Sequence, residues 1–126
     1  MKKHILAAVG LLALSASAFG AADFRAIRER YEKELLENVV AFWEKHSIDR
    51  EYGGFITCLE RDGRPYDTFK QMWMQWRAVW MFAALHNSPY RREPWLKIAE
   101  DGFDFLYAHG RQPDGSYAYS STVRGG

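Results

Sequence analysis

The sequence is short of several features, and each shortage excludes a class of protein. A single cysteine, Cys58, among 126 residues cannot form an intramolecular disulfide. We expect this thiol to serve as a small buried apolar group. The formal net charge is only +1, which provides no basic field for nucleic acid and no polybasic patch for a lipid surface. The cysteine and histidine positions also lack the spacing of a zinc or haem site, so no metal is expected.

The apolar run at the N-terminus is short as well. Ile5–Leu14 follows three basic residues at positions 2–4 and is too short to span a bilayer. Small residues fit a cleavage site near Ala18 to Gly20, so residues 1–20 are predicted to be a secretory signal peptide. A membrane anchor or a buried helix is the alternative. We expect export to a periplasm or the extracellular space, with residues 21–126 as the mature chain.

The mature sequence contains helical patterns separated by glycine-rich turns. Apolar residues recur at helical spacing from Asp23, which can cap the helix, to His46. Gly53-Gly54 interrupts this pattern. Residues 55–67 carry an Asp62-Gly63 turn signal, with a proline on the return side, and predict a small β-hairpin at a sheet edge.

The most informative segment is Lys70–Leu85, KQMWMQWRAVWMFAAL. It predicts a helix from Thr68 to His86 that is apolar nearly all round, as is typical of a buried helix. Arg77 lies on one face of that helix with Trp73 and Trp80. A buried guanidinium costs several kcal/mol unless it is paired. Arg77 is therefore either part of a structural ion pair or a ligand-binding group on an aromatic surface.

A third helix is predicted to begin near Pro94 and to end at Gly110 in a left-handed cap. Its expected apolar stripe consists of Leu96, Ala99, Phe103 and Leu106. The turn pattern that follows His46 then returns after His109, 63 residues later. Such a repeat is typical of folds that bury their faces only by stacking units. We therefore expect an all-α fold with short β-hairpin insertions, of which this chain is the N-terminal portion.

The mature chain resembles the N-acylglucosamine 2-epimerase family, also known as renin-binding proteins, over nearly its whole length and most densely from Gly53 to Phe82. The residues that carry the resemblance are Asp49, Tyr52-Gly53-Gly54-Phe55, Cys58-Leu59-Glu60-Arg61-Asp62-Gly63-Arg64, Asp67, Lys70 and Trp73 to Phe82. The resemblance implies an (α/α)6 barrel that interconverts N-acetylglucosamine and N-acetylmannosamine, with relatives that act on cellobiose or mannose. It also implies that Arg77, in a Gln-x-Arg setting, contacts the sugar, with Trp73 beside it.

The family's reaction removes a proton next to the sugar's carbonyl carbon and returns it to the other face. Two histidines far toward the C-terminus perform it. His46, His86 and His109 do not match them, and we interpret His46 and His109 as groups at helix C-termini. No catalytic residue is expected in these 126 residues, which alone should not turn over substrate. No cofactor is expected, although some relatives respond to nucleotides.

The expected partner is a small sugar, with no nucleic acid and no membrane after signal cleavage; the oligomeric state, a homodimer included, is left open. Two other functions remain as alternatives to the sugar 2-epimerase or isomerase. An α/α-barrel glycoside hydrolase needs two opposed carboxylates. The available acids are interpreted as solvated loop residues: Asp49, Glu60, Asp62 and Asp67. A non-catalytic glycan- or protein-binding helical module is the other alternative, since this chain has no acid/base pair.

Overall fold

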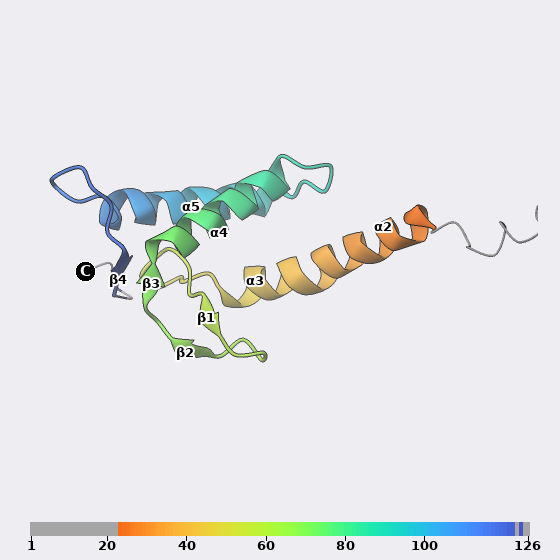
Figure 1. The fold of residues 1–126 in the computed structure, drawn as a ribbon, viewed down its shortest axis with the longest axis horizontal. Helices are drawn as coiled ribbons and strands as arrows, with labels where there is room; N and C mark the ends of the chain where they lie inside the picture. The colour runs from red at the N-terminus through yellow and green to blue at the C-terminus, as the bar shows by residue number, and fades with distance from the viewer. Residues whose placement is uncertain (1–22, 123, 125–126) are drawn as a thin grey trace, which may run out of the picture. The chain divides into compact units, whose positions relative to one another are not determined.

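The computed structural model describes residues 23–122 and residue 124, which divide into two compact units between Leu35 and Leu36 (Figure 1). The predicted signal peptide, residues 1–20, lies outside the described residues. In the first unit, helix α2 (Phe24–Lys33) is capped by the Asp23 carboxylate, which accepts hydrogen bonds from two backbone N–H groups. The predicted cap is confirmed. Within the described residues, no helix has the length and apolar character needed to cross a bilayer.

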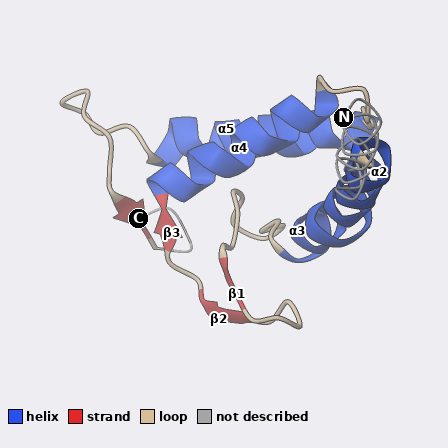
Figure 2. Ribbon diagram, turned by 45° about the vertical axis from the view of Figure 1, so that its right-hand side comes forward, coloured by secondary structure: helices blue, strands red, loops and turns tan. Residues whose placement is uncertain are grey.

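The remaining elements follow along the chain in a regular order. A π-helical segment, η1 (Glu34–Val40), is followed by α3 (Ala41–His46). The helix expected over residues 23–46 is therefore confirmed, with a π-helical stretch that its periodicity did not predict. The later elements are β1 (Cys58–Leu59), β2 (Pro65–Asp67), β3 (Lys70–Gln71), α4 (Met72–His86), α5 (Glu93–His109) and β4 (Ser120–Ser121). The described chain is thus mainly helical with short β-pairs, as predicted (Figure 2).

The predicted hairpin is present as the antiparallel pair β1 and β2. Its turn is closed by hydrogen bonds from Glu60 N–H to Arg64 O at 2.8 Å and from Gly63 N–H to Glu60 O at 2.9 Å. Gly63 has a φ of 86°, a conformation that favours glycine. The Asp62-Gly63 signal therefore located the turn correctly.

Helix α4 begins at Met72, so the predicted start at Thr68 is wrong. Lys70 and Gln71 are extended and pair antiparallel with Ser121 and Ser120 of β4. The N–H of Met72 also donates to the carbonyl of Tyr119 at 3.0 Å. These long-range bonds hold the residues before Met72 in a strand, although their side chains are compatible with a helix.

Helices α4 and α5 lie side by side and enclose the main core (Figures 1 and 2). Its buried members are Val40, Phe55, Phe82, Leu85, Trp95 and Ala99. The rings of Phe55 and Phe82 stack with centroids 5.8 Å apart. Gly102 of α5 makes room for this stack, because a Cβ there would come within 2.4 Å of the Phe55 ring.

The stripe predicted for α5 is only half correct. Ala99 and Leu106 are buried, but Leu96 and Phe103 are exposed. The buried face of α5 also contains Trp95, Gly102 and Phe105. The reason is steric: the helix approaches α4 and Phe55 through the side that carries Gly102, where a larger residue would not fit.

The predicted left-handed cap at Gly110 is also wrong, because this residue has a φ of −85°. Its N–H donates to Leu106 O at 2.8 Å. A Cβ at this position would lie only 2.6 Å from that same oxygen. Glycine is therefore required for close approach and not for a positive φ.

The predicted repeat is confirmed in the backbone. In the first loop (residues 46–57), Ser47 N–H donates to Trp43 O, Ile56 N–H donates to Ser47 O, and Ile48 forms a bridge with Phe55. In the second loop (residues 109–118), Gly110 N–H donates to Leu106 O, Ala118 N–H donates to Gly110 O, and Arg111 forms a bridge with Tyr117. The two loops thus share one hydrogen-bonding pattern, 63 residues apart at their first bond.

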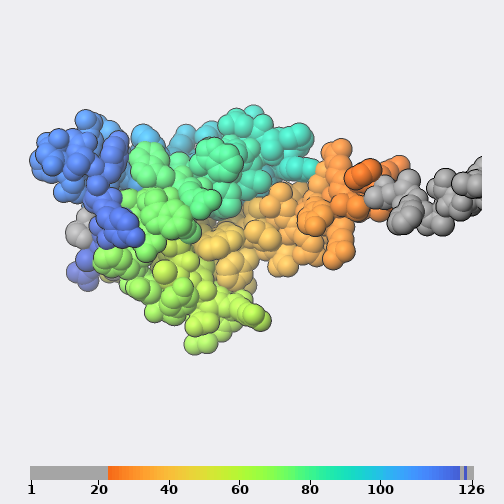
Figure 3. All heavy atoms as spheres, in the orientation of Figure 1, coloured from red at the N-terminus to blue at the C-terminus, as the bar shows by residue number. Residues whose placement is uncertain are grey.

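Exposed aromatic rings gather where α4, α5 and the second loop meet. The ring centroid of Trp76 lies 6.0 Å from that of Phe103 and 6.3 Å from that of Tyr117. Phe103 in turn lies 6.3 Å from Tyr107. We call these four residues the aromatic cluster; all four are exposed. In Figure 3, green atoms of α4 and blue atoms of the second loop form neighbouring parts of the visible surface.

Candidate functional site

The two predicted sugar-binding residues lie together on α4. The Cζ atom of Arg77 is 5.5 Å from the centroid of the Trp73 ring, which is a cation–π distance. The two residues are four positions apart, and a helix places such residues on one face. The structure therefore brings the predicted pair into contact.

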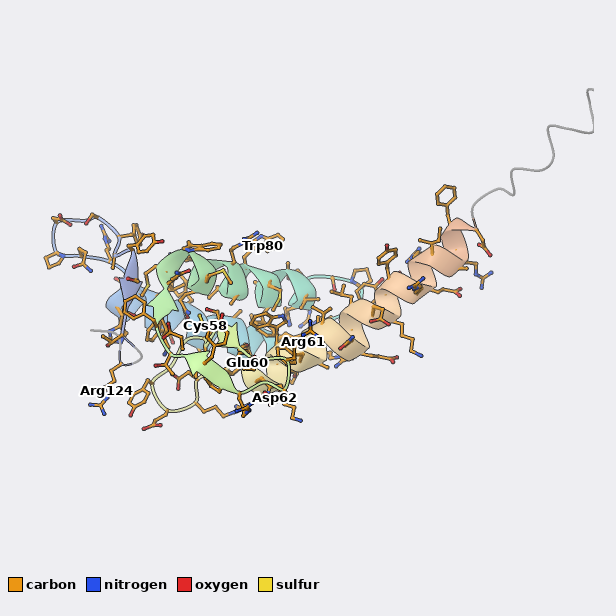
Figure 4. The ribbon with its side chains drawn as sticks, turned by 60° about the horizontal axis from the view of Figure 1, so that its bottom comes forward. Cys58, Glu60, Arg61, Asp62, Trp80 and Arg124 are labelled. Atoms are coloured by element: carbon orange, nitrogen blue, oxygen red, sulfur yellow. The ribbon has the colours of Figure 1, made fainter. Side chains whose placement is uncertain are left out.

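Within the described residues this face of α4 is exposed, whereas burial of the helix is predicted for the complete fold. Arg77 and Trp73 are exposed, and Trp80 is 72% exposed. Figure 4 shows Trp80 on the side of α4 away from the β1–β2 hairpin. The helix packs on α5 and the first loop through its opposite side, which carries the buried residues Met72, Gln75, Phe82, Leu85 and His86. Within the described residues Arg77 forms no ion pair, and its role stays a prediction.

A pocket of about 230 Å³ lies beside Arg77. Its apolar lining side chains are Trp43, Phe55, Met74, Ala78 and Met81. Ser47 and Thr57 add hydroxyl groups, but the Ser47 hydroxyl donates to Trp43 O at 2.6 Å. The pocket is thus a mainly apolar hollow with one guanidinium at its edge. We call it the Arg77 pocket.

One wall of the Arg77 pocket is fixed by Gln75, which is fully buried. The N–H of Phe55 donates to Gln75 Oε1 at 2.7 Å, and Gln75 Nε2 donates to Phe55 O at 2.7 Å. An unpaired buried amide would cost about 1–3 kcal/mol. This pair of hydrogen bonds therefore strongly favours one position of the loop. Gln75 belongs to the Gln-x-Arg setting of the resemblance, but no sequence pattern predicts its hydrogen bonds to Phe55.

The buried charge of this region is Lys70 and not Arg77. The Lys70 side chain is 0% exposed, and its Nζ lies 2.7 Å from Asp49 Oδ2 and 4.4 Å from the Phe105 ring centroid. It also donates to the carbonyl of Gly53. The pair therefore ties the first loop to β3, directly before α4. Lys70 and Asp49 both belong to the motif that carries the family resemblance. That motif is the one sequence signal that pointed to these two residues.

Asp49 is buried, so its interpretation as a solvated loop residue is wrong. Its Oδ1 accepts hydrogen bonds from the N–H groups of Glu51 and Tyr52, each at 3.0 Å. Burial by itself would raise the pKa of Asp49. The hydrogen bonds from Lys70, Tyr52 and Glu51, with the charge of Lys70, outweigh burial and hold the pKa below its ordinary value.

The other three acids are exposed, as predicted (Figure 4 labels Glu60 and Asp62). Asp62 pairs with Arg64 at 2.7 Å, and this hydrogen bond lowers its pKa. Cys58 is half-buried and not the fully buried group expected, because it lies on a two-stranded hairpin that covers it only in part. The hydrogen bond between the side chains of Cys58 and Tyr66 raises the pKa of Tyr66. In the described part of the chain, no three His, Cys, Asp or Glu side chains gather in a metal-binding group.

The histidines lie where the sequence predicted. His46 ends α3 and His109 ends α5. The His46 ring packs against Gly63 at the hairpin turn, where a Cβ would come within 2.1 Å of Nδ1. The His109 ring centroid is 4.8 Å from that of Phe105. Neither histidine lines the Arg77 pocket.

Comparison with known proteins gives a consistent result. Residues 53–126 match the family described as N-acylglucosamine 2-epimerase (GlcNAc 2-epimerase). The chain is 46% identical over 86 residues to N-acylglucosamine 2-epimerase of Mus musculus, covering 67% of this chain and 20% of that protein. The Bos taurus protein of the same name is 44% identical over 105 residues, covering 80% of this chain and 25% of that protein. The chain thus spans about a fifth to a quarter of these relatives.

Solved structures share the fold. Cellobiose 2-epimerase from Bacillus thermoamylovorans superposes with a TM-score of 0.72 at 21% identity, covering 80% of this chain and 26% of that chain. A D-mannose isomerase gives a TM-score of 0.64 at 24% identity, covering 70% of this chain and 23% of that chain. The described chain therefore has the fold of part of an α/α barrel, as the sequence predicted.

Proposed function

Because the chain belongs to the N-acylglucosamine 2-epimerase family, we propose that the full-length protein is a carbohydrate 2-epimerase or isomerase that interconverts N-acetylglucosamine and N-acetylmannosamine. The family match over residues 53–126 carries this proposal. The relatives at 44–46% identity bear the name of that activity. The contact between exposed Arg77 and Trp73 beside a pocket supports a sugar site in this chain.

In this proposal Arg77 and Trp73 bind and orient the sugar. The Trp73 ring offers a flat apolar surface for the C–H face of a sugar, and the Arg77 guanidinium donates to its oxygen atoms. A guanidinium does not give up a proton in proteins, so Arg77 cannot perform the proton transfer. The residues that line the Arg77 pocket in the described chain include neither a carboxylate nor an imidazole. The family resemblance implies that the acid and base lie in the remainder of the full-length protein, and we expect no turnover by the 126 residues alone.

The direct test uses the longest open reading frame that contains this chain. The purified product is incubated in D₂O with N-acetylmannosamine, cellobiose or mannose, and the C2 position is followed by proton NMR. Removal and return of the C2 proton predicts deuterium at C2 together with the epimer or the ketose. A folded full-length protein that exchanges C2 of none of these sugars would overturn the proposal.

Two arginine variants test the role of Arg77. Arg77→Ala should lower kcat/KM by at least about 10-fold, since a charge-assisted hydrogen bond contributes about 1.5–3 kcal/mol. Its melting temperature should stay close to that of the unmodified protein, because Arg77 is exposed. Arg91→Ala is the control: Arg91 is also exposed and pairs only with Glu93 among the ion pairs seen, at 2.8 Å. A drop in melting temperature for Arg77→Ala with unchanged kinetics would favour a structural role.

We also propose that the protein is exported through cleavage near Ala18 to Gly20. The basic start, the short apolar run and the small residues of positions 1–20 support this. Intact-mass spectrometry of the protein from its native host should find a mature N-terminus close to residue 21. Recovery of the chain only from the cytosol, with residues 1–20 retained, would contradict export.

A further inference from the structure

The Arg77 pocket offers a mainly apolar surface to a ligand. It measures about 230 Å³. Five of its lining side chains are apolar. A sugar ring covered with hydroxyl groups would lose hydrogen bonds to water there. The pocket therefore suits one apolar substituent of a ligand and not the ring itself.

The pocket is also held open by its own framework. Gln75 binds both backbone groups of Phe55, and Phe55, which is 1% exposed, stacks on Phe82. The buried pair of Lys70 and Asp49 fixes the start of the same loop. These contacts position a pocket wall before any ligand arrives, so a substituent that enters does not have to order the loop.

We propose that the Arg77 pocket is the subsite for the acyl substituent of an N-acylated hexosamine. The methyl group lies among Met74, Ala78 and Met81, and the acyl oxygen accepts a hydrogen bond from Arg77. The inference rests on the proposed function and deepens it, because it names the substituent that this part of the chain selects. An unacylated sugar has no group that fills the apolar hollow.

The test changes the volume of the pocket and follows a ratio of two substrates. Ala78 lies on α4 in the pocket wall, so Ala78→Leu fills the hollow. In the full-length protein this variant should lower the ratio of kcat/KM for N-acetylmannosamine to kcat/KM for mannose by about 10-fold or more, as expected for a steric change of a few carbon atoms. Ala108→Leu, an equal change at an exposed position of α5 outside the pocket, should leave the ratio unchanged.

A second variant changes the pocket in the opposite direction and does not overpack it. Met81→Ala enlarges the hollow and should raise kcat/KM for N-butyrylmannosamine relative to N-acetylmannosamine by about 10-fold. An unchanged ratio in both variants would overturn the acyl subsite. It would indicate that another part of the full-length chain fills the pocket.

The outcomes separate this inference from the proposed function. If the protein epimerises mannose or cellobiose but neither N-acylated sugar, the acyl subsite is overturned while a sugar 2-epimerase remains. If no sugar is turned over, the proposed activity fails, and saturation-transfer NMR with N-acetylmannosamine then judges the subsite. A strong acetyl-methyl signal that Ala78→Leu abolishes and Ala108→Leu preserves would support it, and any other pattern would overturn it.

Discussion

The first and second loops have nearly the same backbone but very different surroundings. Each begins at a helix C-terminus, turns through glycine of positive φ (Gly53 and Gly54 in the first loop, Gly115 in the second) and returns to an isolated bridge. Phe55 of the first loop is 1% exposed, whereas Tyr117, which takes the corresponding bridge position, is 61% exposed. Within the described residues, the first loop is formed with burial and the second without it, so local sequence specifies the turn in both.

The side chains that fix the loops differ in the same way. The first loop is held by Lys70 and Gln75, both of which are fully buried. Lys70 lies in β3 and Gln75 lies near the start of α4. At the position of Asp49, the second loop has Gln112, which is exposed. For the 126-residue chain, the comparison predicts that substitutions in the first loop are costly and that substitutions in the second are mild.

The largest effect is expected from Lys70→Met. This change leaves the Asp49 carboxylate buried without its cation, and breaking such a pair typically costs about 3–5 kcal/mol. The double variant Asp49→Asn with Lys70→Met should cost less than the single variant, because no charge remains buried while the Asn oxygen still accepts from Glu51 and Tyr52. Urea unfolding of the full-length protein measures both. A double variant less stable than Lys70→Met would contradict this account of the pair.

Replacement of one positive-φ glycine in each loop, Gly54 and Gly115, should give the next largest difference. Gly54 has a φ of 68°, and a Cβ there would lie 2.7 Å from Phe105 Cδ1 and 2.8 Å from Gln75 Oε1. Gly115 has a φ of 86°, but a Cβ there would meet nothing within 4 Å. Gly115→Ala should therefore cost only the backbone term of about 1–2 kcal/mol, and Gly54→Ala should cost a further 1–3 kcal/mol or so for overpacking. Equal losses in urea unfolding would show that the first loop can relax.

Lowering the pH should change the unfolding free energy through Asp49 of the first loop more than through Asp114 of the second. The folded-state pKa of Asp49 is below its ordinary value, so its contribution to stability is present above about pH 4 and is lost as pH falls through the folded-state pKa. The difference in unfolding free energy between the unmodified protein and Asp49→Asn should shrink over that range. The pKa of Asp114 is also lowered, by the hydroxyl and N–H of Ser116, but this carboxylate is exposed. Asp114→Asn should give a much weaker pH dependence, and a pH-independent cost of Asp49→Asn would contradict the assignment.

The smallest effect is expected from Gln112→Ala in the second loop. Its side chain is exposed, and surface substitutions of this kind usually change the unfolding free energy by no more than about 0.5 kcal/mol. The loop's bonds to this residue use its backbone, since Gln112 N–H donates to Ser116 O at 2.8 Å and Gln112 O accepts from Gly115. A loss above 1 kcal/mol or so in urea unfolding would show that the second loop also depends on a side-chain contact.

Local patterns predicted what local chemistry controls. The Asp23 cap, the hairpin turn at Gly63 and the repeat after His109 depend on neighbouring residues, and the structure has all three. The start of α4 depends instead on pairing with Ser120 and Ser121, which no pattern around Thr68 could reveal.

The faces of α4 could not be told apart for a related reason. The helix is apolar nearly all round, so its sequence does not say whether the side of Arg77 or the side of Gln75 packs on α5. The burial of Lys70 depends on Asp49, 21 residues earlier, and a lone lysine before a helix is ordinarily solvated. Arg77 and Trp73 were brought together correctly by helical spacing alone, and the proposal that they bind a sugar still awaits its test.

The aromatic cluster has a consequence for how the protein is made. Ribosomes add about 5–20 residues per second, and N-terminal segments emerge first. In relatives this segment is only a fifth to a quarter of the chain. Trp76, Phe103, Tyr107 and Tyr117 would therefore stay in contact with water for on the order of ten seconds or more while the rest is synthesised. During that interval the exposed aromatic surface is open to contacts that lead to aggregation.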